Sequence, residues 1–153
     1  SGSRFGESNA DGVFGADILT RYKAVINCWT RYVFFKVNAS KRLQIAKFAS
    51  LQHFTRVPMR EEANRAFTVP CTINGRATRL LVDTGAFVTT FDQALAKSSG
   101  ISLKATGAAG SFADGISRPI SLGKFKQVTI GQFKVPPQTL AVAVLLVARP
   151  GAR

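Results

Sequence analysis

Leu80-Leu81-Val82-Asp83-Thr84-Gly85-Ala86 is the stretch that decides how this chain folds. Its three large apolar residues predict the end of a buried strand, and the Asp-Thr-Gly that follows predicts a turn. This order places a carboxylate at the edge of a hydrophobic core, where burial disfavours the charged form. Gly85 allows a sharp turn that brings backbone N–H groups near the carboxylate. Such a loop suits a carboxylate that shares a proton with a second one and activates a water. By itself, Asp-Thr-Gly also fits an ordinary Asp-led turn.

The surrounding pattern predicts β structure. Residues 67–73 alternate apolar and polar side chains, and Asn74-Gly75 then supplies a two-residue hairpin turn. A return strand follows and runs into Asp83. A short helix is expected after Phe91, and Ser98-Ser99-Gly100 is expected to end it.

The rest of the chain's second half predicts further short strands. We expect them at 119–123, 125–130 and 133–135, with turns at Gly123 and Gly131-Gln132, and a buried closing strand at 140–147. The Gly- and Ala-rich segment 106–118 is expected to be a mobile loop. Many short strands with one or two helices indicate a mainly β protein, a small barrel or sandwich.

The first third of the chain is less regular. Residues 12–19 predict a short strand that leads into a helix, with Asp17 as the helix cap. Residues 24–36 are rich in β-branched and aromatic residues and predict a strand. Residues 38–52 have mixed periodicity and predict a linker with some helical character.

The stretch from about Phe54 to Val147 resembles the retropepsin-like aspartic proteases, on the hairpin and on Asp83-Thr84-Gly85-Ala86. The resemblance implies a small closed β barrel and a peptidase. It also implies that Asp83 is the catalytic aspartate, that Thr84 locks two active-site loops together, and that a Gly-rich flap closes over a bound peptide. The site residues expected on this basis are the catalytic Asp83, Thr84 and Gly85, and the substrate-binding Ala86, Phe87, Gly107, Ala108, Ala109, Gly110 and Phe112.

A second match is out of place in the chain. Residues 13–19 and 24–35 resemble the elements that end this fold, yet here they precede Asp83. The resemblance therefore implies that residues 1–37 are the C-terminal elements of a preceding or permuted unit, with a linker at 38–52. Residues 53–153 would form a protease domain without its usual C-terminal elements. A fragment of a tandem bacterial-type protein and a circular permutation both fit, and the first is favoured.

The reaction needs two aspartates, but the sequence holds one Asp-Thr-Gly and no Asp-Ser-Gly. The second aspartate is expected from a dimer partner or from a missing upstream repeat. The substrate class implied is polypeptide, with no cofactor. The alternative interpretation is a non-catalytic peptide-binding or dimerisation module on the same fold.

Charge and cysteine content weigh against other classes. The formal charge is +13, but its basic residues are scattered, so a nucleic-acid-binding domain is the least favoured interpretation. Cys28 and Cys71 lie far apart without a CxxC or His partner, which disfavours a metal site and leaves free thiols or one disulfide open. The apolar run 140–148 is too short to span a membrane as a helix.

Overall fold

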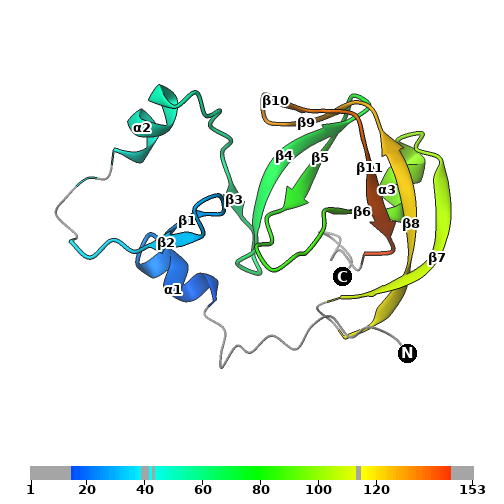
Figure 1. The fold of residues 1–153 in the computed structure, drawn as a ribbon, viewed down its shortest axis with the longest axis horizontal. Coiled ribbons are helices and arrows are strands. Elements are labelled where there is room, and N and C mark those ends of the chain that lie inside the picture. Colours follow the sequence, from blue (N-terminus) through cyan, green and yellow to red (C-terminus); the bar gives the residue numbers. More distant parts are fainter. Residues whose placement is uncertain (1–14, 39–41, 43, 113–114, 146–153) are drawn as a thin grey trace. The chain divides into compact units, whose positions relative to one another are not determined.

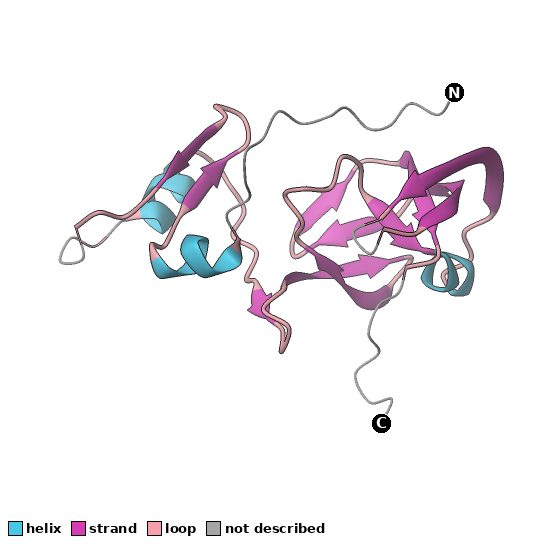
Figure 2. Cartoon of the chain, turned by 90° about the horizontal axis from the view of Figure 1, so that it is seen from below, coloured by secondary structure: helices cyan, strands magenta, loops and turns pink. Residues whose placement is uncertain are grey.

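The computed structural model describes residues 15–38, 42, 44–112 and 115–145 (Figure 1). The chain divides into two compact units, Ser1–Ile45 (unit 1) and Ala46–Arg153 (unit 2). Unit 1 is one helix and one hairpin, whereas unit 2 is mainly strand (Figure 2). The sequence-based expectation of a strand at 12–14 lies outside the described residues.

Unit 1 begins with helix α1 (Ala16–Arg21). Gly15 is its N-cap residue and makes no side-chain cap. The prediction that Asp17 caps the helix is therefore wrong. Asp17 instead lies in the first turn, where its negative charge still complements the N-terminal end of the helix dipole.

The predicted strand at 24–36 is a hairpin of two short antiparallel strands, β1 (Val25–Asn27) and β2 (Tyr32–Phe34). The side chain of Asn27 ends β1 and starts the turn to β2. Its Oδ1 accepts hydrogen bonds from the backbone N–H groups of Trp29 and Thr30, both at 3.0 Å. This local side-chain bonding competes with strand pairing and closes a turn.

Helix α2 (Ile45–Leu51) begins at the boundary between the two units, within the segment expected to be a linker. Ile45, Phe48 and Leu51 are all exposed. α2 therefore has helical spacing of apolar residues without a buried face.

Unit 2 contains two sheets. The strands of the first are β10 (Phe133–Val135), β9 (Val128–Ile130), β4 (Phe67–Ile73) and β3 (Arg60–Glu61) in that order, with β5 (Arg76–Leu81) also paired to β4. The second has the order β6 (Thr90–Asp92), β11 (Gln138–Ala143), β8 (Ser117–Phe125) and β7 (Leu103–Ser111). The mainly β class is confirmed. Among the described strands neither sheet closes on itself, so the closed barrel is not part of what the structure shows.

One hydrophobic cluster joins the two sheets. Ile73 of β4, Val142 of β11 and Phe125 of β8 are its largest fully buried side chains. The rings of Phe125 and Phe91 stack with centroids 4.5 Å apart. Because both sheets contribute side chains to this cluster, burial of apolar surface fixes the second sheet against the first.

The hairpin of β4 and β5 agrees with the prediction. Asn74 and Gly75 have φ of 49° and 79°, as a two-residue turn of the favoured type requires, and Ile73 pairs with Arg76. The expected buried alternation is present only at the end of β4, where Cys71 and Ile73 are buried, because all the residues from Phe67 to Pro70 are half-buried.

The strand boundaries predicted around Gly123 are wrong. Gly123 lies inside β8 and makes no turn, and the chain turns after Phe125 instead. A Cβ on Gly123 would lie 2.8 Å from Cγ2 of Ile101 and 3.3 Å from Cδ2 of Leu103. Glycine is needed at this position for close packing.

Helix α3 (Gln93–Ser98) follows β6 as predicted, and Gly100 with φ of 74° comes directly after its end. Its N-cap is Asp92, whose Oδ1 accepts from the N–H of Leu95 at 3.0 Å. The other oxygen of this carboxylate accepts from the N–H of Leu145 at 3.2 Å. One carboxylate thus links β6, α3 and the segment after β11.

Both cysteines are free thiols: Cys28 is exposed and Cys71 is buried. Burial raises the pKa of the Cys71 thiol above its usual value. Of the two alternatives left open by the sequence, the structure has free thiols.

Candidate active site

Asp83 lies in the loop that joins β5 to β6. The backbone N–H of Gly85 donates to Oδ1 of Asp83 at 2.8 Å, and the N–H of Ala86 donates to the main-chain oxygen of Asp83 at 3.4 Å. The loop therefore folds back on its own carboxylate, as its sequence predicts. An N–H aimed at one oxygen fixes the orientation of the carboxylate.

Glycine suits position 85 because there is little room for a side chain there, and not because the backbone has a positive φ. A Cβ there would lie 3.3 Å from Oδ1 of Asp83, which is tighter than ordinary van der Waals contact. A larger residue at position 85 would therefore push against the carboxylate that the Gly85 N–H holds.

The predicted burial of this loop is wrong for the single chain. Asp83, Thr84 and the residues around them are exposed. Apolar side chains of the same segment are exposed as well, including Phe87 at 87%. We call this set the Asp83 rim: Leu81, Val82, Phe87 and Val88. Exposed apolar side chains on both sides of a carboxylate form a surface that another protein chain can cover.

The segment expected to be a mobile loop is a strand hairpin. β7 and β8 pair in register from Leu103 with Gly123 to Ser111 with Ser117, with an irregularity between Ala105 and Ala109. Gly107, with φ of 73°, lies within this irregularity. Small residues therefore permit a bulge that bends the hairpin.

Near the end of this hairpin, a cation stacks on an aromatic ring. The guanidinium carbon of Arg118 lies 5.0 Å from the centroid of the Phe112 ring, and the Arg118 residue is buried. This pair was not expected from the sequence, because a mobile loop at 106–118 does not bring Phe112 and Arg118 together, whereas a paired hairpin does.

The predicted site residues form two groups in unit 2. Asp83, Thr84, Gly85, Ala86 and Phe87 share the β5–β6 loop, whereas Gly107, Ala108, Ala109, Gly110 and Phe112 lie in or next to β7.

A polar cluster supports the strand that leads to Asp83. Glu62 accepts two hydrogen bonds from Arg60, each at 2.9 Å, and one from the hydroxyl of Thr68 at 2.5 Å. Arg79 of β5 donates to the Thr68 hydroxyl at 2.7 Å and to its main-chain oxygen at 2.9 Å. The bonds from Thr68 and Arg60 hold the pKa of Glu62 below its usual value. This cluster joins β3, β4 and β5, and the sequence did not reveal it because only the pairing of these strands brings Thr68 and Arg79 to Glu62.

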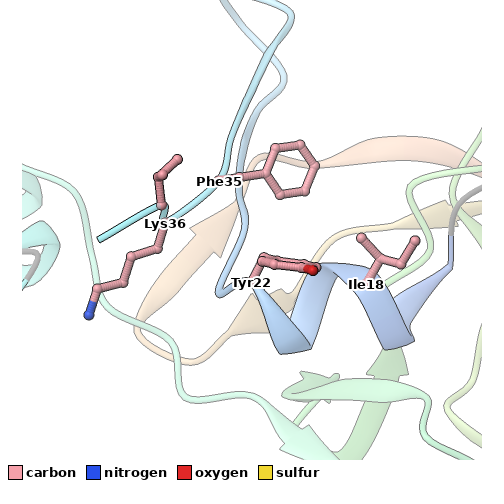
Figure 3. Close-up of a pocket in the computed structure, with 5 residues that line it drawn as sticks. Ile18, Tyr22, Phe35 and Lys36 are labelled. Atoms are coloured by element: carbon pink, nitrogen blue, oxygen red, sulfur yellow. The ribbon is translucent and has the colours of Figure 1, made fainter. Parts of the chain in front are cut away.

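The described residues include no group of three or more His, Cys, Asp or Glu side chains that could hold a metal ion. A described pocket of about 410 Å³ lies in unit 1 rather than beside Asp83, and it is lined by Ile18, Tyr22, Phe35, Lys36 and Val37 (Figure 3). No described helix has the length and apolar character needed to cross a membrane.

A mainly β unit that presents Asp-Thr-Gly on a tight loop has the features of the aspartic protease class. A sequence profile of this family, described as aspartyl protease, matches residues 69–149, which is more than half of the chain. The chain therefore belongs to the aspartyl protease family, and the family resemblance seen in its sequence is confirmed.

The chain is similar to a crystal structure of a retropepsin-like aspartic protease from Rickettsia conorii, at 19% identity and a TM-score of 0.48. The similarity covers 59% of this chain and 76% of that one. No curated protein matches the chain.

Proposed function

We propose that this chain is an aspartic-type endopeptidase in which Asp83 is one of two catalytic carboxylates. The observation that carries the proposal is the Asp83 loop, because its Gly85 N–H lies 2.8 Å from one carboxylate oxygen inside the region that matches the family. Thr84 and Gly85 are positioning residues of this loop. No metal or organic cofactor is part of the proposal.

The second aspartate would come from a symmetric dimer partner or from another repeat, since the chain has a single Asp-Thr-Gly. The exposed Asp83 rim supports this assignment. Pairing two such loops about a two-fold axis would bury the apolar residues of the rim and bring the carboxylates together. Both the expected burial of Asp83 and the function of Thr84 in joining two loops would then arise in the assembled protein.

Two carboxylates at such close range titrate as a coupled pair, with one ionised and one protonated. The ionised carboxylate would take a proton from the bridging water as that water attacks the scissile carbonyl carbon. The protonated carboxylate would hydrogen-bond the carbonyl oxygen, and a proton would later pass to the leaving amine. The product is two peptides, with one water consumed.

The β7–β8 hairpin would act as the flap over a bound polypeptide. Its bulge at Gly107 and its small residues Ala108, Ala109 and Gly110 leave room for a substrate backbone. The Arg118–Phe112 stack would stiffen the end of this hairpin. Ala86 and Phe87 would contribute apolar contacts to the substrate.

We also propose that residues 1–37 belong to a preceding or permuted protease-like unit, with 38–52 as the linker and 53–153 as the protease domain. The helix-then-hairpin order of unit 1 and the lack of a buried residue in α1 support this assignment. An element of this size does not bury enough apolar surface to be stable alone.

The test is cleavage of a fluorescently labelled, unfolded protein by Asp83→Asn. We expect loss of at least about 1,000-fold in kcat/KM, on the scale of removing one member of a catalytic unit, with an unchanged circular dichroism spectrum. Asp17→Asn, the same change at an exposed carboxylate of unit 1, is the matched control and should keep full activity. Cleavage that persists in the Asp83 variant would contradict the proposal.

The second candidate function is the non-catalytic peptide-binding or dimerisation module. It is favoured by the exposure of Asp83 in a chain with one Asp-Thr-Gly. Sedimentation analysis separates the two: a strict monomer that binds peptides without cutting them is such a module, whereas a dimer that cuts them is the peptidase.

A further inference from the structure

The turn of the β1–β2 hairpin presents Trp29, the most exposed aromatic side chain among the described residues. Trp29 is 93% exposed, and it is the single Trp of the chain. The Asn27 side chain accepts from the Trp29 and Thr30 N–H groups, and Arg31 follows with φ of 61°. Trp29 thus projects from a turn of defined conformation, next to a basic residue.

One face of the same hairpin continues this aromatic surface. The rings of Tyr32 and Phe34 lie 6.2 Å apart on β2, and the two side chains are 65% and 55% exposed. Phe35 has the opposite strand parity and contacts Tyr22 at the end of α1, with ring centroids 6.5 Å apart (Figure 3). α1 therefore packs on one face of the hairpin, whereas the Tyr32 and Phe34 side chains are exposed. We call Trp29, Tyr32 and Phe34, with Arg31, the hairpin surface.

The charge around this surface is mainly positive. Between Asp17 and Glu61 the sequence has nine basic residues and no acidic one. The helix and hairpin of unit 1 contain one acid, Asp17 of α1, and four bases: Arg21, Lys23, Arg31 and Lys36. Screening extends over about 8 Å at physiological ionic strength, so bases on a hairpin this short act together on anything at its surface.

We propose that the hairpin surface binds the headgroup region of an anionic lipid membrane. Trp and Tyr are the side chains that favour the membrane–water interface, because each joins an apolar ring to a polar group. A basic segment without acids is attracted to anionic lipid, with each Lys or Arg near the surface strengthening binding about fivefold. An exposed aromatic surface in a segment rich in Lys and Arg fits both requirements. The hairpin would lie in the membrane interface and would not span the membrane.

Lipid fits the hairpin surface better than the other occupants of such a face. A second copy docked through this same surface would place the basic residues of one hairpin against those of the other, and these like charges would repel. The proposal does not depend on Asp83, so an Asp83→Asn chain should bind membranes equally well. Failure of membrane binding and failure of catalysis are therefore separate results.

The test is co-sedimentation of the full chain with two kinds of vesicle. One is made of phosphatidylcholine alone, and the other also contains about 30% phosphatidylserine, an anionic lipid that makes the vesicle surface negative. We expect at least about tenfold tighter binding to the anionic vesicles, weakened by added salt. Trp29, as the single Trp, should show a blue-shifted emission and less quenching by acrylamide on the vesicles.

Two variants localise the binding. Trp29→Ser with Arg31→Glu should weaken binding to anionic vesicles at least about tenfold, since it removes the interfacial ring and reverses one charge. The matched control is Phe133→Ser with Lys134→Glu, an exposed aromatic and its basic neighbour on β10, which should bind normally. Circular dichroism checks that both variants are folded.

Several results would overturn the proposal. Equal loss of binding in the control variant would show that total charge, rather than the hairpin surface, drives binding. A blue shift that depends on protein concentration without vesicles would assign the surface to a second copy. Binding of a single-stranded RNA oligonucleotide through Trp29 and Arg31, with no vesicle binding, would assign it to nucleic acid.

Discussion

Units 1 and 2 use similar side chains with opposite results. Phe125 of unit 2 is fully buried and stacks on Phe91, whereas Phe34 of unit 1 is 55% exposed beside an exposed Tyr32. The difference lies in what surrounds the strands. β8 lies between two other strands and faces a second sheet, but β2 has β1 as its partner. Aromatic content therefore makes a core where layers stack, and makes a surface where a two-stranded ribbon stands by itself.

The largest expected effect tests this contrast directly. Phe125→Ala removes a buried ring and should lower the free energy of unfolding by about 3–5 kcal/mol. Phe34→Ala, the same change on the exposed hairpin, should alter it by less than about 0.5 kcal/mol. Urea denaturation followed by far-ultraviolet circular dichroism measures both. Equal losses would mean that the hairpin is part of a core, and the contrast between the units would be broken.

A smaller effect is expected from overfilling the same core. Gly123→Ala places a Cβ 2.8 Å from Ile101 and 3.1 Å from Phe125, and should cost about 1–3 kcal/mol. Lys124→Ala, at the next and exposed position of β8, is the control and should stay within about 0.5 kcal/mol of the parent. Thermal melts of the two variants suffice. A neutral Gly123→Ala would show that β8 can move away from Ile101.

The smallest effect concerns the polar cluster at Glu62. Because its pKa is lowered in the folded chain, this carboxylate adds stability above its unfolded pKa, and that stability is lost as the pH falls through the folded value. The melting temperature of the parent should therefore fall more steeply between about pH 5 and about pH 3 than that of Glu62→Gln. Glu61→Gln, at the neighbouring carboxyl of β3, should keep the parent's slope. Parallel slopes for all three proteins would contradict a stabilising interaction at Glu62.

Local patterns were enough to predict several elements of unit 2. Alternation over residues 67–73 and the Asn74-Gly75 turn gave β4, its turn and β5, because strand period and turn backbone are set by neighbouring residues. Gly123 shows the limit. A glycine in sequence looks like a turn, and only the position of Ile101 from another element shows that the reason is space.

Of the candidate site, the local geometry of the Asp83 loop could be predicted, whereas the functions of its residues stay predictions. The Gly85 hydrogen bond to Asp83 spans two residues and follows from the tripeptide itself. The exposure of the Asp83 rim could not be predicted in this way. Three apolar residues before an acid predict burial, but they do not show whether the same chain or another chain buries them. The turn at Asn27 was not predicted. The β-branched and aromatic residues of 24–36 indicate one strand, although the Asn27 side chain accepts a backbone hydrogen bond that closes a turn.

The parallel pairing of β6 with β11 has a consequence for the order in which the protein matures. The Asp83 loop connects β5 to β6. β5 pairs with β4, the strand just before it, whereas β6 pairs with β11, which is synthesised much later. Long-range parallel pairing forms slowly, because a large loop must close first. During synthesis, β5 can therefore be in place while the far side of the loop waits for residues 138–145 and for the Asp92 bond to Leu145. A nascent chain would therefore hold Asp83 in a loop that is anchored on one side only, until β11 has been synthesised and has paired with β6.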